Sequence, residues 1–204
     1  RRRGEDTELF VIDTSTPSIY SDIAFADLLK LEYPKAFVVL VGTHPSALPE
    51  ETLNNSKAVD AVAIKEFDYS VRDIARAIVS GENPFDIPGI AWCDEGRKVS
   101  INEPYSYITD LDEIPFAAEF IKKHLDDRDY FFAAAAYPEI QIFTGRGCPA
   151  RCTFCVYLKP CTGIHIDCGA QKMSLTNSSI LQIIFRKLKK SLLKMIHLPS
   201  RKSA

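Results

Sequence analysis

A run of five consecutive apolar residues, Phe37–Val41, constrains the fold of this chain more than any other feature. A continuous apolar run rich in β-branched residues predicts a strand buried on both faces, as in a parallel sheet covered by helices. Further strand patterns occupy Leu9–Ile12 and Val59–Ile64, and helical patterns occupy Ser21–Leu31 and Val71–Val79. This alternation predicts an α/β fold with a parallel sheet and right-handed crossovers.

The pattern changes after Pro84. Gly89–Cys93 and Lys98–Ile101 are predicted to pair as a hairpin across the turn Asp94–Gly96. Residues 105–115 have the composition of a linker, and Glu119–Leu125 is predicted to be helical. A last strand is expected at Ile140–Thr144, immediately before a glycine-rich turn.

Three cysteines, Cys148, Cys152 and Cys155, lie within eight residues in the sequence GRGCPARCTFCVY. Such clustering points to metal or redox chemistry rather than to disulfides. A cluster of four irons normally takes four thiolates, so a loop with three leaves one iron open to another molecule. The CxxxCxxC spacing therefore predicts a 4Fe–4S cluster with an open coordination site.

Two other interpretations of the cysteines remain open. A structural zinc ion would need a fourth ligand, and Cys161, His165 and Cys168 are the candidates. A redox pair of Cys152 and Cys155 would leave Cys148 without a role. Cys93, in an apolar strand pattern, is expected to be a core residue.

The cysteine segment resembles the motif of the radical S-adenosylmethionine (SAM) family, including the aromatic Phe154 before the last cysteine. The resemblance implies that Cys148, Cys152 and Cys155 bind the cluster, that Phe154 contacts the cofactor, and that the open iron binds SAM. It implies cleavage of SAM to a 5′-deoxyadenosyl radical, with the loop following the first strand of a partial (β/α) barrel.

The region upstream resembles the cobalamin-binding domain that precedes the barrel in one group of these enzymes. The resemblance is carried by VVLVGTHPSALPEETL (Val38–Leu53) and VDAVAIKEFDYSVRDIARAI (Val59–Ile78). It implies that Gly42, Thr43 and His44 contact cobalamin where a strand ends. His44 can equally be a polar loop residue that caps the next turn. The sequence contains no DxHxxG motif, so cobalamin would lack an axial histidine from the protein.

Together these patterns divide the chain into four segments. Residues 1–83 are expected to form a partial, doubly wound, Rossmann-like domain of the cobalamin-binding type. Residues 84–138 are expected to form a linker with a hairpin and a helix, and residues 139–157 the start of the radical SAM barrel. Residues 158–204 form an atypical tail.

Charge separates the tail from the rest of the chain. Residues 1–155 hold 26 acidic and 16 basic residues, whereas residues 156–204 hold one acidic and nine basic residues. The tail contains a basic, leucine-rich stretch at Ile180–Leu198. In a shifted frame, its back-translation permits an acidic string that resembles the family's own continuation. We therefore hypothesise a one-base loss near Tyr157–Leu158, which leaves the barrel truncated.

These observations predict a fragment of a radical SAM enzyme, associated with cobalamin, of the methyl-transfer or oxidative-cyclisation class. Whether the fragment is itself an enzyme is left open, because we expect it to lack full activity. The expected partners are a small-molecule substrate and an electron donor such as flavodoxin or ferredoxin, in the cytoplasm. Neither nucleic acid nor a membrane span is expected. The alternative is a non-enzymatic zinc-binding or interaction module with a basic C-terminal helix.

Overall fold

A computed structural model of the chain describes residues 7–106, 108, 110, 113–115, 117–129 and 153–155. The chain divides into two units. The first contains residues 1–108 and 147–165, and the second contains residues 109–146 and 166–204. Each unit is described by itself below.

The first unit is an α/β domain whose elements alternate along the chain. In chain order they are β1 (Leu9–Asp13), α1 (Ile19–Glu32), β2 (Phe37–Val41), α2 (Thr43–Ala47), α3 (Pro49–Asn54), β3 (Ala61–Ala63), α4 (Asp68–Ser80), η1 (Pro84–Asp86), β4 (Ile90–Cys93) and β5 (Val99–Ile101). Within the second unit, the described elements are α5 (Ala117–His124) and η3 (Asp127–Asp129).

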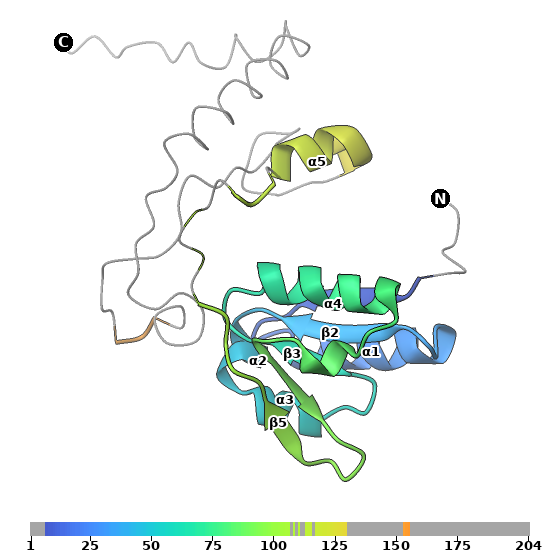
Figure 1. Cartoon of the computed structure of the whole chain (residues 1–204), viewed down its shortest axis with the longest axis vertical. Helices are drawn as coiled ribbons and strands as arrows, with labels where there is room; N and C mark the ends of the chain where they lie inside the picture. Colours follow the sequence, from blue (N-terminus) through green and yellow to red (C-terminus); the bar gives the residue numbers. More distant parts are fainter. Residues whose placement is uncertain are drawn as a thin grey trace, which may run out of the picture. The chain divides into compact units, whose positions relative to one another are not determined.

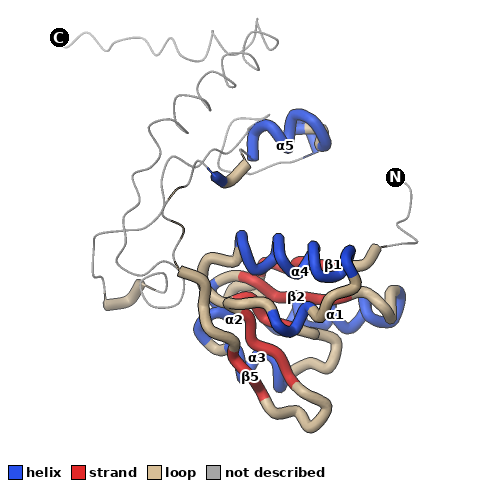
Figure 2. The backbone as a smooth tube through the Cα atoms, in the orientation of Figure 1, coloured by secondary structure: helices blue, strands red, loops and turns tan. Residues whose placement is uncertain are grey.

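The five strands form one sheet in the order β1-β2-β3-β4-β5 (Figures 1 and 2). β1 pairs with β2 and β2 with β3 in parallel, so these three strands end at the same edge of the sheet. β4 pairs with β3 in the antiparallel direction, and β5 pairs with β4 likewise. The predicted hairpin therefore forms, and it extends the sheet.

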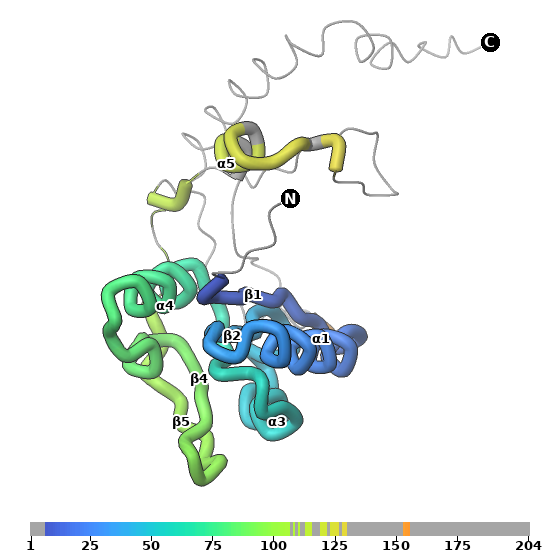
Figure 3. Tube along the Cα trace, turned by 90° about the vertical axis from the view of Figure 1, so that its right-hand side faces the viewer, coloured from blue at the N-terminus to red at the C-terminus, as the bar shows by residue number. Residues whose placement is uncertain are grey.

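Helices cover both faces of the sheet, which explains why β2 is buried along its whole length. Figure 3 shows α1 and α3 on one side of the strands and α4 on the other. One core cluster joins Ile23 of α1 and Leu53 of α3 to Val38 and Leu40. The other joins Ile74 of α4 to the strand residues of the opposite face. This three-layer arrangement is Rossmann-like and confirms the predicted α/β fold.

The two long helices differ in how apolar they are around their circumference. α4 buries Ser70, Ile74 and Ala77 on one face and ends at Gly81, whose φ of +74° is the left-handed conformation common at helix ends. α1, in contrast, carries several large apolar residues on its solvent-facing side. Its exposed apolar side chains are Tyr20, Phe25, Leu28 and Leu31.

Parts of the sequence-based interpretation lie outside the described residues. These are the expected strand at 140–144, the start of the barrel and the tail from residue 158. Among the helices that the structure describes, none has the length and apolar character needed to cross a membrane.

Candidate functional site

The loop Gly42–His44 lies at the edge of the sheet where the three parallel strands end, as the sequence predicted. Gly42 directly follows β2 and begins α2. Its φ of +107° and ψ of −168° belong to a region that essentially only glycine adopts. A Cβ atom at this position would lie 2.5 Å from Asp13 Oδ1 and 2.5 Å from the Thr14 carbonyl oxygen. Glycine therefore lets the β2–α2 loop approach the β1–α1 loop.

The His44 side chain contacts the β1–α1 loop across this junction. Its side chain is buried, and Nδ1 lies 3.2 Å from Thr16 Oγ1 in the β1–α1 loop. Among the described residues, His44 Nε2 has no hydrogen-bond partner, although it is buried. The hydroxyl of Thr14, which is 2% exposed, also lacks one within the described part.

Unpaired polar atoms in a protein interior are costly and call for an explanation. Thr14 and His44 belong to adjacent loops, since the Thr14 amide donates to the Val41 carbonyl oxygen at 2.8 Å. Both loops follow parallel strands, which is the edge where open α/β sheets bind ligands. The unpaired imidazole nitrogen and hydroxyl are therefore candidate contacts for a polar ligand group at this edge. We call the junction of these two loops, residues 13–16 and 42–46, the crevice, after the place where open α/β sheets bind ligands.

A third loop, between β3 and α4, borders the crevice. Lys65 has a φ of +67°, and its amide donates to Ser46 Oγ of α2 at 3.0 Å. The next residue, Glu66, accepts a hydrogen bond from the Ile108 amide through Oε2 at 3.0 Å.

Sequence reasoning missed Thr14, Thr16, Ser46 and the Lys65–Glu66 pair. The available signal was their position: each follows closely on one of the three parallel strands.

The structure describes only part of the cysteine loop. Cys148 and Cys152 lie outside the described residues, while Cys155 is half-buried with a free thiol. Phe154 is 90% exposed. Within the described ranges, no three His, Cys, Asp or Glu side chains are grouped to hold a metal ion. The cluster ligands thus remain a prediction.

A charged cluster at α4 holds the segment that follows the hairpin. Arg72 donates to both carboxylate oxygens of Asp73, at 2.7 and 2.9 Å, and the Tyr105 hydroxyl donates to Asp73 Oδ2 at 2.5 Å. The hydrogen bonds from Arg72, with a smaller contribution from Tyr105, lower the pKa of Asp73 to about 2 against the opposing effect of burial. Burial, followed by the bond to Asp73, raises the pKa of Tyr105 to about 12.

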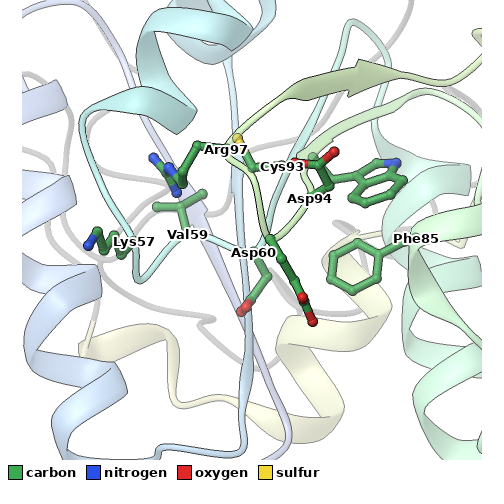
Figure 4. Close-up of a pocket in the computed structure, with 9 residues that line it drawn as sticks. Lys57, Val59, Asp60, Phe85, Cys93, Asp94 and Arg97 are labelled. Carbon is green, nitrogen blue, oxygen red and sulfur yellow. The ribbon is translucent and has the colours of Figure 1, made fainter.

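A pocket of about 580 Å³ opens at the opposite edge of the sheet, where β3 begins (Figure 4). Two of its charged groups, Asp60 and Arg97, serve the fold. Asp60 pairs with Lys30 at 2.7 Å and accepts the Val38 amide. Arg97 donates to the carbonyl oxygens of Leu53 and Ser56. These groups hold the ends of neighbouring elements together, so we assign the functional site to the crevice.

No family model matches the chain. It is 28% identical over 150 residues to an uncharacterized methyltransferase of Pyrococcus horikoshii. It is 24% identical over 173 residues to cytidylyl-2-hydroxyethylphosphonate methyltransferase of Streptomyces wedmorensis. The matches cover 74% and 71% of this chain but only 31% of either relative. The chain thus spans about a third of the length of the curated relatives it matches.

Two solved structures share the fold. One is the cobalamin-dependent S-adenosylmethionine radical enzyme OxsB with aqua-cobalamin and S-adenosylmethionine bound. Its TM-score is 0.67 and its sequence identity 16%, and the match covers 89% of this chain and 24% of OxsB. The other is the radical S-adenosylmethionine methyltransferase TsrM from Kitasatospora setae, with a TM-score of 0.56 and 16% identity over 87% of this chain and 36% of that one. The curated relatives are methyltransferases, and the solved structures belong to radical S-adenosylmethionine enzymes.

Proposed function

We propose that this chain is part of a cobalamin-dependent radical SAM enzyme that transfers a methyl group to a small-molecule substrate. In this proposal the crevice binds cobalamin, and Cys148, Cys152 and Cys155 bind a 4Fe–4S cluster. The cluster would supply the electron that cleaves SAM, and cobalamin would carry the methyl group. An electron donor such as flavodoxin or ferredoxin would reduce the cluster in the cytoplasm.

The observation that carries the proposal is the order of the two features along the chain. An α/β domain with loops gathered at its carboxyl edge precedes a CxxxCxxC motif with the RGCP lead-in. The similarity of the chain to methyltransferases in sequence, and to radical enzymes titled as cobalamin-dependent in fold, supports this combination.

In this proposal, residues of the crevice contact polar groups at the periphery of cobalamin. The left-handed Gly42 keeps the β2–α2 loop close to the neighbouring loop, and two buried polar atoms, His44 Nε2 and Thr14 Oγ1, have no partner among the described residues. The side chains present would bind and orient the amide or phosphate groups of such a ligand. Since His44 is buried beside Thr16, it would act as a polar contact and not as an axial ligand.

Anaerobic reconstitution of the full chain with iron and sulfide tests the cluster. We expect a brown chromophore and an EPR signal after reduction, both lost in C148A, C152A or C155A. The matched controls C161A and C168A should retain both signals. Stoichiometric zinc without iron in the reconstituted protein would contradict the cluster assignment and support the zinc alternative.

Titration with hydroxocobalamin tests the crevice. We expect binding to change the visible spectrum without the signature of histidine ligation to cobalt, because no DxHxxG motif is present. His44→Gln keeps a polar side chain and should weaken binding, whereas His124→Gln, in α5, should not. An unchanged spectrum for the wild-type chain would contradict cobalamin binding.

A further inference from the structure

The chain leaves the α/β unit through a segment that side chains hold in place, residues 102–106 and 108. We call it the exit segment. The Asn102 side chain donates to the carbonyl oxygens of Phe85 and Ile87, both at 2.7 Å, and accepts from Trp92 Nε1. Tyr105 follows with its bond to Asp73. The exit segment is thus fixed to the η1 region and to α4 at successive points.

The last anchor is the bond from the Ile108 amide to Glu66 Oε2, at 3.0 Å. Ile108 is 6% exposed, so this amide is shielded from water and depends on its carboxylate acceptor. A hydrogen bond to a charged group contributes more than one between neutral groups. Thr109, the next residue, belongs to the second unit. Glu66 therefore holds Ile108, the residue after which the chain enters the second unit.

Glu66 follows Lys65, and the two residues contact different parts of the unit. The Lys65 amide donates to Ser46 Oγ, two residues beyond His44 in α2, and Ser46 is 8% exposed. Lys65 has a left-handed φ of +67°, which a residue with a side chain keeps only when its surroundings enforce it. The Lys65 amide bond to Ser46 and the bond of the adjoining Glu66 to Ile108 both depend on the course of this loop, so we expect loss of one to weaken the other.

We propose that Glu66 is a positioning residue, and that the bridge Ser46–Lys65–Glu66 couples the state of the crevice to the anchoring of the exit segment at Ile108. The bridge has two states, one with the Ile108 amide bonded to Glu66 and one with it released. A ligand that shifts α2 changes the support of Lys65 and hence the balance between these states. By linkage, anchoring at Ile108 changes the affinity of the crevice to the same extent. The inference rests on the proposed function, in which the crevice binds cobalamin.

Amide hydrogen exchange of the full chain, followed at Ile108, tests the bridge without any cofactor. Glu66→Ala should speed exchange at Ile108 by about tenfold or more, as expected for the loss of a bond to a charged group. Glu66→Gln keeps an acceptor oxygen and should restore most of the protection. Ser46→Ala should also speed exchange at Ile108, although Ser46 bonds to Lys65 and not to Ile108.

Two matched controls separate this effect from general loosening. Glu50→Ala removes an exposed carboxylate from α3, and Ser100→Ala removes a hydroxyl from β5. Both should leave exchange at Ile108 at the wild-type rate. If Ser46→Ala also leaves that rate unchanged, the bridge does not couple the two ends and the proposal is overturned.

A second arm repeats the measurement with hydroxocobalamin. Binding should change exchange at Ile108 in the wild-type chain, and Glu66→Ala should remove that change while the visible spectrum still reports binding. If cobalamin binds and wild-type and Ser46→Ala chains respond identically at Ile108, the coupling fails and the proposed function stands. If cobalamin does not bind, the proposed function fails, and the variants alone decide whether the bridge couples crevice and exit segment.

Discussion

At the scale of single residues, the crevice depends on backbone conformations that few residue types can adopt. Gly42 occupies a region reserved for glycine, and Lys65 holds a left-handed conformation despite its side chain. Gly42 directly precedes α2, the short helix that carries His44 and Ser46, and the Lys65 amide donates to Ser46. The geometry of the candidate site is therefore set by the loops, and Lys65 holds a strained backbone conformation within them.

Gly42→Ala should destabilise the domain by roughly 1–3 kcal/mol from its backbone conformation alone. Displacement of Asp13 and Thr14, which the new Cβ atom would contact, should add to this cost. Gly81→Ala is the matched control, because Gly81 also has a positive φ but open space around it. It should cost about 1 kcal/mol, the penalty of a left-handed residue. Urea unfolding followed by circular dichroism measures both, and equal losses would contradict the steric role of Gly42.

Tyr105→Phe should lower stability at neutral pH by about 1 kcal/mol, because it removes one hydrogen bond to Asp73. It should also reduce the loss of stability in acid. The folded pKa of Asp73, about 2, lies below its ordinary value of 3.8, so its contribution is complete above pH 4 and lost as the pH falls towards 2. Without Tyr105 that pKa rises, and the acid-dependent part shrinks.

The stability that Tyr105 itself contributes depends on pH in the opposite direction. Its folded pKa is raised to about 12, so its contribution is present below pH 10 and lost as the pH rises through 12. Thermal unfolding between pH 2 and pH 7 compares Tyr105→Phe with Tyr20→Phe, whose ring is 76% exposed. The control should follow the wild-type pH profile. A Tyr105→Phe profile parallel to the wild type would show that Asp73 does not depend on Tyr105.

At the scale of elements, the Asn102 side chain links the end of the hairpin to the η1 region. Asn102→Ala should destabilise the domain by about 1–3 kcal/mol, because it leaves two carbonyl oxygens and the Trp92 indole nitrogen without their partner. Asn54→Ala, at an exposed position in α3, is the control and should stay near wild type. Chemical unfolding monitored by Trp92 fluorescence measures both, and equal midpoints would contradict the connecting role of Asn102.

The elements were largely predictable from the sequence, whereas their long-range contacts were not. All five strands were predicted, the central ones from apolar runs, because a strand buried on both faces, such as β2, is continuously apolar. α2 was missed, because its five residues are too few to show a helical pattern. Glycine and histidine after β2 indicated the crevice. The partners Thr16 and Ile108 lie 28 and 42 residues from His44 and Glu66, and no local pattern encodes such pairs.

At the scale of the whole molecule, the chain matches only about a third of the length of its curated relatives. The α/β unit carries its own sheet, its own two-sided core and the crevice. The α/β unit therefore has the elements of a folded layer structure around the crevice. The substrate and the rest of the reaction belong to proposals about the longer relatives.

Residues 158–204 should exchange their amide hydrogens much faster than the strands of the sheet. Their positive charge and lack of an alternating strand–helix pattern suggest a sequence not selected together with the acidic core, so we expect few protecting contacts. Exchange measured by mass spectrometry tests this. The hypothesis of a lost base makes a second, stricter prediction. Restoring one base near codon 158 should open a long reading frame that encodes barrel motifs. A stop codon within the next forty codons would refute it.

The reversal of strand direction between β3 and β4 has a practical use for engineering. It places the β4–β5 turn, Asp94–Arg97, at the edge opposite the crevice. Glu95 and Gly96 are exposed, while Arg97 must be kept because it supports the end of α3. A fluorescent label inserted between Glu95 and Gly96 would therefore mark the molecule while the crevice keeps its native sequence.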